Sequence, residues 1–315
     1  MLRHLFLPFG LLLAIPVALL QPAGGKWLAG YNGIQVLILL IFVISGYQSK
    51  SHRTAGNRYL LKILFFSACS ALLLSPLLGL AFAKMFCLPR ELAIGLLVIA
   101  SVPPTLSSGI VITEISGGNT NLALFLTIGL NILGIFSIPL LLNICLQASG
   151  PIAINQLALL GKMFFLILLP FTLGKAIRHI RHPDRISPRW SYVNSSCVIL
   201  VVYISLSVAR QAFTGLHPHE YAAIIGIVAG FHGLLLLTNA TWGKMLHLAA
   251  SDQKAVLFVN SQKTLPISIA ILANMPVATG SAVIVCLIFH FVQLVIDSTI
   301  GSLWGKQRQA NATEG

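Results

Sequence analysis

Long apolar segments separated by short polar loops run through the whole 315-residue chain. Clear examples are residues 34–45, 60–83, 122–145, 164–174, 221–237 and 281–296. With its flanks, each segment is long enough for a helix that crosses a hydrocarbon layer of about 30 Å. The pattern predicts ten spans, at residues 4–21, 32–47, 59–83, 91–116, 119–148, 152–175, 189–211, 221–244, 252–274 and 279–304. The predicted fold class is an all-α polytopic membrane protein.

Two of the predicted spans are interrupted near their centres by polar residues and proline. The fourth contains Pro103-Pro104-Thr105-Leu106-Ser107-Ser108-Gly109, and the ninth contains Asn260-Ser261-Gln262-Lys263-Thr264-Leu265-Pro266-Ile267-Ser268. Aligned on their Thr-Leu pairs, the two interruptions lie 159 residues apart, half the length of the chain. Broken hydrophobic segments at corresponding positions of two halves are the best sequence indication of a binding site in a secondary transporter.

The interruptions also have a chemical meaning. Prolines donate no backbone hydrogen bond and disfavour a helical predecessor, so backbone groups around each break lose their helical partners. Such groups are tolerated at membrane depth only inside the protein or along a polar cavity. Freed carbonyls can coordinate a cation, and half-helix N-termini favour an anion. The alternative is a simple proline kink with serines bonded to preceding carbonyls. Small oxygen ligands lie beside both breaks, at Thr105, Ser107, Ser108, Thr264 and Ser268.

The two halves of the chain have the same arrangement of spans. Five spans precede residue 150 and five follow it, with the break in the fourth of each set. At an offset of 162 residues, Asn131 lies opposite Gln293, and both are polar positions inside the helix that follows a break. Because five is odd, repeats of this kind are inverted in the membrane. We therefore predict two inverted five-helix repeats, residues 1–150 (helices 1–5) and 151–315 (helices 6–10).

Composition and charge support a membrane protein and exclude other classes. Only 9% of residues are charged, against about 25% in soluble domains. The net charge of +13 suggests nucleic acid as a partner, but most basic residues lie in the loops on one side of the predicted membrane. That side has 14 of them, at Arg3, Lys50, Arg53, Arg58, Lys62, Lys175, Arg178, Arg181, Arg185, Arg189, Lys244, Lys254, Lys306 and Arg308, and the other has four, at Lys26, Lys84, Arg90 and Arg210. This asymmetry predicts cytoplasmic termini and contacts with anionic membrane lipid, and no nucleic-acid partner.

Little in the sequence favours an enzyme. There are seven acidic residues, mostly in loops, and neither an HExxH nor a GxSxG motif. The five cysteines are scattered without a CxxC pair, so we expect them to pack as small hydrophobic residues and to hold no metal. The first span is similar to a signal peptide, but no small-residue cleavage site follows it, so we expect a retained helix.

The motifs at the breaks resemble those of the bile acid:sodium symporter superfamily, over essentially the full chain. The family motif Pro-Gly-Gly-Thr-Ala-Ser-Asn in helix four is matched by Pro103-Pro104-Thr105-Leu106-Ser107-Ser108. The Gly-Asn at the start of helix five is matched by Gly118-Asn119. The resemblance implies a panel of spans 1, 2, 6 and 7 and a core of spans 3, 4, 5, 8, 9 and 10, with discontinuous helices four and nine crossing at their breaks. It also implies a ligand between panel and core, and alternating access.

The chain departs from this family at the sodium sites. The family motif Glu-x-x-x-Gln-Asn-Ser is matched by residues 258–264, where Phe258 replaces the glutamate and Lys263 the asparagine. On helix five, Ala123 stands at a serine position, whereas Thr127 matches the family's threonine. Lys263 resembles a divergent branch that includes a vertebrate member without bile-acid transport and a fungal relative linked to calcium homeostasis. These departures argue against a sodium site and leave sodium, a proton or no ion as the coupling partner.

Lys263 itself is predicted near the bilayer midplane, where ionisable residues are costly and indicate function. One hypothesis is that its ammonium replaces a bound cation, either as a fixed charge or by exchanging protons. A second is that it binds the anionic group of a substrate. A third, purely structural alternative is that it bonds the carbonyls freed in span four. The candidate substrate- or ion-binding residues are Thr105, Ser107, Ser108, Asn119, Thr127, Asn131, Asn260, Ser261, Gln262, Lys263, Thr264, Ser268 and Gln293.

Other polar residues within the spans have weaker predictions. His290 and Glu114 are candidates for a proton relay, and Asp297 is expected near the cytoplasmic end of span ten, with its carboxylate solvated. Asn239 and His232, like Asn131 and Gln293, could hold helices together.

The sequence thus predicts a carrier of a small organic anion or similar solute, in a bacterial inner membrane. The alternative is a channel-like or non-transporting regulator of ion homeostasis, for example of calcium.

Overall fold

Every regular element in the described part of the chain is a helix. The computed structural model describes residues 6–49, 58–149, 155–181, 187, 189–275, 277 and 279–313. In this part, seven helices are long and apolar enough to cross a membrane, or eight if α1 and α2, bent by 94°, form one span. The polytopic membrane class is therefore confirmed. The number ten stays a prediction, because α3 and the two halves of the fourth span are too short to count alone. The basic residues Arg3, Lys50, Arg53 and Arg185 lie outside the described residues.

The chain divides into two compact units, each built from three segments. Unit 1 comprises Met1–Ser51, Ile154–His217 and Pro266–Ile284, and unit 2 comprises His52–Ala153, Pro218–Leu265 and Val285–Gly315. Unit 1 contains the spans expected to form a panel, numbers 1, 2, 6 and 7, together with the second half of span nine and the start of span ten. The units therefore do not coincide with the halves 1–150 and 151–315, which remain a prediction about repeats.

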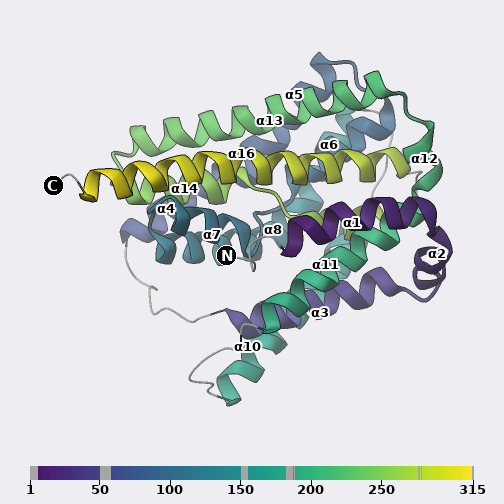
Figure 1. The fold of residues 1–315 in the computed structure, drawn as a ribbon, viewed down its shortest axis with the longest axis horizontal. Helices are drawn as coiled ribbons and strands as arrows, with labels where there is room; N and C mark the ends of the chain where they lie inside the picture. Colours follow the sequence, from purple (N-terminus) through teal and green to yellow (C-terminus); the bar gives the residue numbers. More distant parts are fainter. Residues whose placement is uncertain are drawn as a thin grey trace. The chain divides into compact units, whose positions relative to one another are not determined.

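Unit 1 is organised around α11, which packs against α1, α2 and α3 (Figure 1). Its elements are α1 (Phe6–Leu20), α2 (Pro22–Gly30), α3 (Gly33–Gln48), α9 (Gln156–Met163), the π-helical turn η3 (Phe164–Leu168), α10 (Leu169–Arg181), α11 (Arg189–Val208), α12 (Arg210–Gly215) and most of α15 (Leu265–Leu272). The helices α3 and α10 approach most closely. A Cβ atom added to Gly46 would overlap the Phe171 carbonyl, and one added to Gly174 would overlap the Val43 carbonyl. Glycine is thus needed on both helices for the two backbones to touch.

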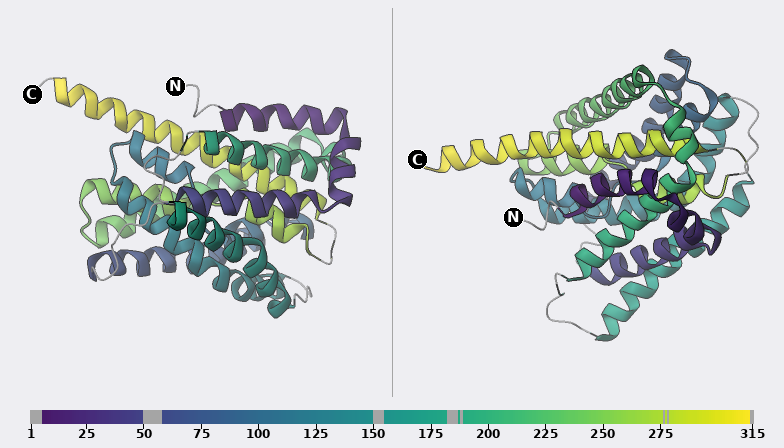
Figure 2. Two further views of the ribbon diagram at one scale, coloured as in Figure 1. Left: turned by 90° about the horizontal axis from the view of Figure 1, so that it is seen from below. Right: turned by 45° about the vertical axis from the view of Figure 1, so that its right-hand side comes forward.

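Unit 2 contains both sides of the first break and the first half of the second. Its elements are α4 (Arg58–Ala68), the π-helical turn η2 (Cys69–Leu74), α5 (Ser75–Met85), α6 (Arg90–Ser101), α7 (Ser108–Ile115), α8 (Thr120–Ser149), α13 (Pro218–Met245), α14 (Ala250–Ser261) and most of α16 (Gly280–Thr313), which Figure 2 shows as one continuous helix. The helix α14 packs against α7, α8 and α13, and α6 packs against α5 and α8. These contacts are supported by a buried apolar cluster, which includes Ile63, Leu72, Leu122, Ala123, Leu126, Leu130, Val256 and Val259.

Both predicted interruptions are present. The fourth span stops being helical after Ser101 and resumes at Ser108, and the ninth stops after Ser261 and resumes at Leu265. In between, the backbone of Val102 and Gln262 is extended. All of residues 101–105 and 260–265 are buried, so neither break exposes its backbone to a lipid environment.

Candidate functional site

Three consecutive carbonyls at the first break are each bonded by a different group of unit 2. The Val102 carbonyl accepts from Lys263 Nζ (3.2 Å), the Pro103 carbonyl from the Thr264 backbone N–H (3.1 Å), and the Pro104 carbonyl from Asn131 Nδ2 (3.1 Å). These carbonyls have lost their helical donors because the chain is not helical between Ser101 and Ser108. The two broken helices therefore meet at their breaks, and Lys263 and Thr264 of the second break supply hydrogen-bond donors to carbonyls freed at the first.

The second break is bonded in turn by one side chain of α16. The Lys263 backbone N–H donates to Gln293 Oε1 (2.8 Å), and Gln293 Nε2 donates to the Lys263 carbonyl (2.9 Å). The same amide lies 2.9 Å from His290 Nδ1. A carboxamide has both a donor and an acceptor, so Gln293 replaces the two helical partners that Lys263 lacks. The predicted residues Asn131 and Gln293 thus act at the two breaks, each through its amide.

The Lys263 ammonium is fully buried and is held by backbone carbonyls. Besides Val102, it donates to the Ala71 carbonyl at 2.6 Å. The Ala71 carbonyl has no donor of its own in the π-helical turn η2, because the Ser75 N–H bonds to Ser70 and the next residue is Pro76. In the described part of the chain, the ammonium donates to two backbone carbonyls, so carbonyl dipoles and not a carboxylate stabilise its charge. A lone cation held by freed carbonyls is the arrangement with which transporters bind a coupling ion.

A second polar network joins the first break to α16 and α13. Gln262 Oε1 accepts from the hydroxyls of Thr105 and Ser108, both at 2.7 Å, and Gln262 Nε2 donates to Asp297 Oδ2 at 2.8 Å. The other carboxylate oxygen of Asp297 lies 2.8 Å from His232 Nε2. Both members of this pair are fully buried. The prediction that Asp297 is solvated is therefore wrong: α16 runs on to Thr313, so residue 297 is far from the helix end.

Comparison with known proteins identifies the family to which this arrangement belongs. The model of the SBF-like CPA transporter family matches residues 6–306. The chain belongs to this family. The resemblance to bile acid:sodium symporters is thereby confirmed, and the family is one of transporters.

Similar proteins occur in plants, bacteria and vertebrates. "Probable sodium/metabolite cotransporter BASS4, chloroplastic" of Arabidopsis thaliana is 30% identical, over 98% of this chain and 74% of the relative. The protein PA2026 of Pseudomonas aeruginosa is 27% identical, over 98% of this chain and 96% of the relative. "Sodium/bile acid cotransporter 7" of Danio rerio is 25% identical, over 84% of this chain and 81% of the relative.

Phe258 and Ala123, which the resemblance to symporters places at expected sodium-binding positions, both lie in apolar surroundings. Phe258 is fully buried, packs against the Trp304 ring (centroids 5.8 Å apart) and belongs to a cluster with Ile112 and Leu257. Ala123, at the family's serine position, lies in the larger apolar cluster of unit 2. Neither position offers an oxygen side chain to a cation.

Several other predicted residues lie away from the crossing of the breaks. Asn119 caps α8 by accepting from the Leu122 N–H and donates to Asp252 Oδ1; it is about 18 Å along the helix from Asn131. Glu114 and Ser107 are exposed. Ser261 bonds back to the Leu257 carbonyl.

The remaining candidates are buried. Asn260 donates to Ser67 and to Asn239, beside the turn η2. The Thr127 hydroxyl has no partner within the described part of the chain. Ser268 is fully buried in unit 1.

Sequence reasoning missed two groups of this site, the Ala71 carbonyl and the Asp297 carboxylate, although each had a signal in the sequence. Pro76 follows Ala71 by five residues inside a span, and a proline there removes a donor from a carbonyl one turn earlier. The role of Asp297 had a weaker signal. With His290 and Gln293 it forms a polar stripe at i, i+3 and i+7 on one helix face, which indicates a face turned toward protein.

Proposed function

We propose that this protein is a secondary active transporter, which moves a small organic anion or similar solute across a bacterial inner membrane. It works by alternating access, with two inverted five-helix repeats, residues 1–150 and 151–315, and both termini in the cytoplasm. The observation that carries the proposal is the Lys263 ammonium, bound by the Ala71 and Val102 carbonyls where the two broken helices meet.

Lys263 takes the place of a coupling cation in this mechanism. Its contacts favour this role over direct binding of a substrate anion, because the ammonium is fully buried and directed at carbonyl oxygens. A sodium ion about 4 Å from it would be repelled by about 4 kcal/mol at moderate dielectric. Phe258 offers no compensating carboxylate. The transporter therefore works without sodium, either with a proton as its coupling ion or with none.

The names of relatives support the substrate class. The plant relative is named a sodium/metabolite cotransporter and the zebrafish relative a sodium/bile acid cotransporter. Metabolites and bile acids include many organic anions of low mass. The chain itself carries an excess of 13 positive charges, which favours an anionic solute over a cationic one.

Thermal unfolding of the purified protein in sodium chloride and in choline chloride tests the role of Lys263. We expect the wild type to be indifferent to sodium. Lys263→Ala leaves a cation-sized space beside two carbonyls, so this variant should be less stable in choline and should regain part of its stability in sodium. Lys254→Ala is the matched control, because Lys254 lies on α14, the helix that precedes the break, and also donates to a carbonyl, that of Ser116 (2.6 Å). Sodium stabilisation of the wild type, or a Lys263→Ala protein indifferent to sodium, contradicts the proposal.

Uptake into proteoliposomes tests transport itself. We expect saturable uptake of at least one member of a panel of radiolabelled small organic acids, without a sodium gradient, and loss of that uptake in Lys263→Ala. A conductance that does not saturate would instead favour the channel-like regulator of ion homeostasis.

A further inference from the structure

A histidine of α13 and an aspartate of α16 meet far from the ends of both helices. His232 Nε2 lies 2.8 Å from Asp297 Oδ1, and both side chains are fully buried. His232 is near the centre of α13, which has 28 residues, so it is about 20 Å from either end of this helix. Ionisable side chains at such a depth in a membrane protein are costly and indicate function.

The hydrogen bonds of this pair define where its protons lie. Gln262 Nε2 donates to Asp297 Oδ2 (2.8 Å), and a carboxylate only accepts, so the imidazole proton is on Nε2 of His232. The other ring nitrogen, Nδ1, is buried and has no hydrogen-bond partner in the described part of the chain. A ring nitrogen bonded to an N–H could not accept a proton, and one bonded to a carbonyl would keep it. The Nδ1 atom of His232 is therefore open to both states.

His290, seven residues before Asp297 on α16, lacks this freedom. Its Nδ1 accepts from Gln293 Nε2 (2.9 Å), because Gln293 Oε1 already accepts from the Lys263 N–H. The ring of His290 thus has its own proton on Nε2. The Gln293 amide blocks the atom that stays open in His232.

The charges around the pair leave room for one proton. Lys263, next to Gln262 in the chain, is positive and Asp297 is negative, so the two sum to zero while His232 is neutral. A proton added to Nδ1 makes an imidazolium that faces the Asp297 carboxylate directly. A buried charge requires such a partner.

The other charged side chains on helices of unit 2 packed against α13 or α16 all lie within five residues of a helix end. On α4, α5, α6, α7 and α14 they are Arg58, Lys62, Lys84, Arg90, Glu91, Glu114, Asp252 and Lys254. On α13 the nearest are Glu220 and Lys244, each twelve residues from His232, and on α16, beyond His290, the nearest is Lys306, nine residues after Asp297. These distances correspond to about 13 Å or more along the helix.

Gln262 connects the pair to both breaks. It directly follows α14, at the start of the second break, and its Oε1 accepts from the hydroxyls of Thr105 and Ser108 at the first (both 2.7 Å). Its Nε2 and His232 Nε2 share one carboxylate. Hydrogen bonds strengthen as their members become charged, so an imidazolium draws the Asp297 carboxylate away from Gln262.

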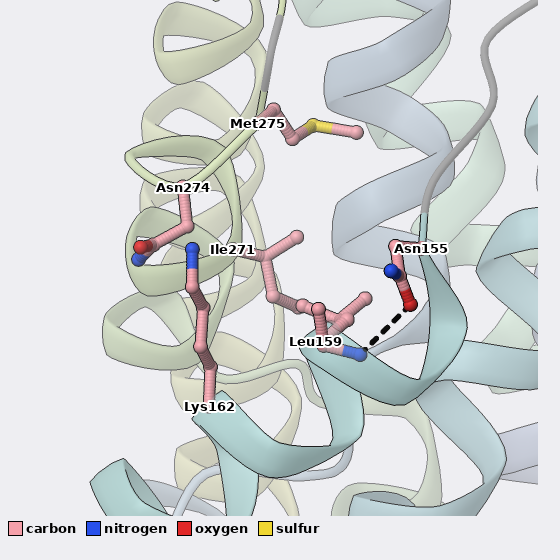
Figure 3. Close-up of a pocket in the computed structure, with 7 residues that line it drawn as sticks. Asn155, Leu159, Lys162, Ile271, Asn274 and Met275 are labelled. Atoms are coloured by element: carbon pink, nitrogen blue, oxygen red, sulfur yellow. Dashed lines mark hydrogen bonds between the residues drawn. The ribbon is translucent and has the colours of Figure 1, made fainter.

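The residues that line the recess between α9 and α15 in unit 1 provide a contrast (Figure 3). The ionisable side chain among them, Lys162, is exposed, and Asn155 caps α9 by accepting from the Ala158 N–H (3.0 Å). An exposed group exchanges protons with water without altering contacts inside the protein. A coupling proton therefore requires a buried group such as the pair in unit 2.

We propose that the His232–Asp297 pair binds the proton that couples transport, with Nδ1 of His232 as the accepting atom and Gln262 as the link to the breaks. A hydronium ion gives one proton to the Nδ1 lone pair and leaves as water, so the charge of the pair changes from −1 to 0. Lys263 stays a fixed charge. The coupling role rests on the proposed transport function, whereas proton binding does not.

Nitrogen-15 NMR of histidine-labelled protein in phosphatidylcholine nanodiscs tests the site, because the Nδ1 resonance shifts strongly when this atom is protonated. The His232 ring is recognised by its contact with Phe289, whose ring centroid is 5.6 Å away. Between about pH 9 and about pH 5, we expect His232 Nδ1 to become protonated. In Asp297→Asn it should stay unprotonated, since an imidazolium there would be buried without a carboxylate. His219→Gln, the matched control, removes an exposed histidine of the same helix and should leave the titration unchanged.

Hydrogen exchange tests the link through Gln262. After correction for the intrinsic effect of pH, residues 105–109 of the wild type should exchange about fivefold faster at the lower pH, which corresponds to the loss of one hydrogen bond. Gln262→Met cannot bond Asp297, so this variant should still take up the proton at His232 but lose the difference in exchange.

Three results would overturn the inference. They are a His232 ring that keeps one protonation state in the wild type, a titration that persists in Asp297→Asn, and a pH response of residues 105–109 that persists in Gln262→Met. These measurements involve no flux. A pair that binds a proton in a protein without saturable uptake keeps this site and removes the proposed function, whereas saturable uptake with a His232 that does not titrate keeps the function and removes the site.

Discussion

At the scale of single residues, the breaks are stabilised by side chains that each replace a missing backbone partner. Asn131 supplies a donor for the Pro104 carbonyl, Gln293 supplies a donor and an acceptor for Lys263, and Lys263 supplies donors for Ala71 and Val102. An unsatisfied backbone group inside a membrane costs several kcal/mol, so each replacement contributes more here than it would on a surface. Loss of any one of these side chains would leave a specific backbone group without its hydrogen-bond partner.

The pair of His232 and Asp297 gives a sharp prediction on stability. Asp297→Asn removes the charge that faces His232 while it keeps the shape, and it leaves a histidine buried beside an amide. Removing one partner of a buried hydrogen bond typically costs about 1–3 kcal/mol, and we expect a loss of that order in the free energy of unfolding. Chemical denaturation in detergent measures it.

The control for this prediction is Glu114→Gln, since that carboxylate is exposed and its loss should change stability by less than about 0.5 kcal/mol. The double variant Asp297→Asn/His232→Gln should lose less than the sum of its single variants, because the two side chains are in contact. A cost below about 1 kcal/mol for Asp297→Asn would mean that the pair does not support unit 2.

The residues of the site were predictable to the extent that their chemistry depends on neighbours in sequence. Lys263 could be predicted as a site residue because an ammonium in the middle of an apolar span has no counter-charge among its neighbours in sequence. The identity of its partners, Ala71 and Val102, depends on which helices touch, and sequence does not contain that information directly. Asp297 was placed wrongly because hydropathy ended the tenth span at residue 304, whereas polar residues continue the same helix to Thr313.

At the scale of helices, the contact between α3 and α10 depends on one glycine from each. We expect Gly174→Ala to lower the stability of the protein by several kcal/mol or to prevent folding, since the new methyl group would overlap the Val43 carbonyl and a backbone cannot yield as a side chain can. Gly161→Ala is the matched control: it lies in α9 of the same unit, and a Cβ there meets nothing within 4 Å.

The control variant Gly161→Ala also has a predicted effect on stability. A helical glycine replaced by alanine without a clash gains about 0.5–1 kcal/mol from the lower entropy of the unfolded chain. Thermal unfolding monitored by tryptophan fluorescence should therefore show opposite shifts for the two variants. Equal shifts would show that the α3–α10 contact tolerates a methyl group.

Helix positions were predictable, and helix irregularities were not. The predicted spans 59–83 and 221–244 correspond to helical residues 58–85 and 218–245, because the hydrocarbon layer sets both the length and the composition of a span. The π-helical turns at Cys69–Leu74 and Phe164–Leu168 insert an extra residue without any change in hydropathy. Such turns often occur at functional sites. Here one of them supplies the Ala71 carbonyl, and the other connects α9 to α10.

At the scale of the whole chain, the repeats predicted from the sequence and the compact units of the structure divide the chain at different positions. The repeats predicted from the breaks are two continuous halves, whereas each compact unit draws segments from both halves. The two descriptions agree if each half contributes its first two spans to unit 1 and most of the others to unit 2. In such an arrangement the chain passes between the units several times, and one of these passages, between Leu265 and Pro266, directly follows the break of span nine.

The distribution of basic residues predicts the orientation of the chain in the membrane, with both termini in the cytoplasm. Among the described basic residues, Arg58, Arg189 and Lys254 are each within the first turns of a helix that we expect to start in the cytoplasm. Positively charged loops are retained on that side. A fluorescent protein fused to either terminus should therefore fluoresce, and alkaline phosphatase fused to the C-terminus should be inactive. Phosphatase inserted after Leu88, in a loop expected outside, should be active.

This experiment also tests the number of spans. An even number places both termini on one side of the membrane, and an odd number separates them. Seven helices of the described part qualify as spans by length and composition, and ten require that α1, α3 and the halves of the broken fourth span cross as well. If the two termini report opposite sides, ten is wrong and one of these short elements does not cross. If they report the same side, with Leu88 opposite, the short broken helices are membrane-spanning, as a transporter whose site lies at its breaks requires.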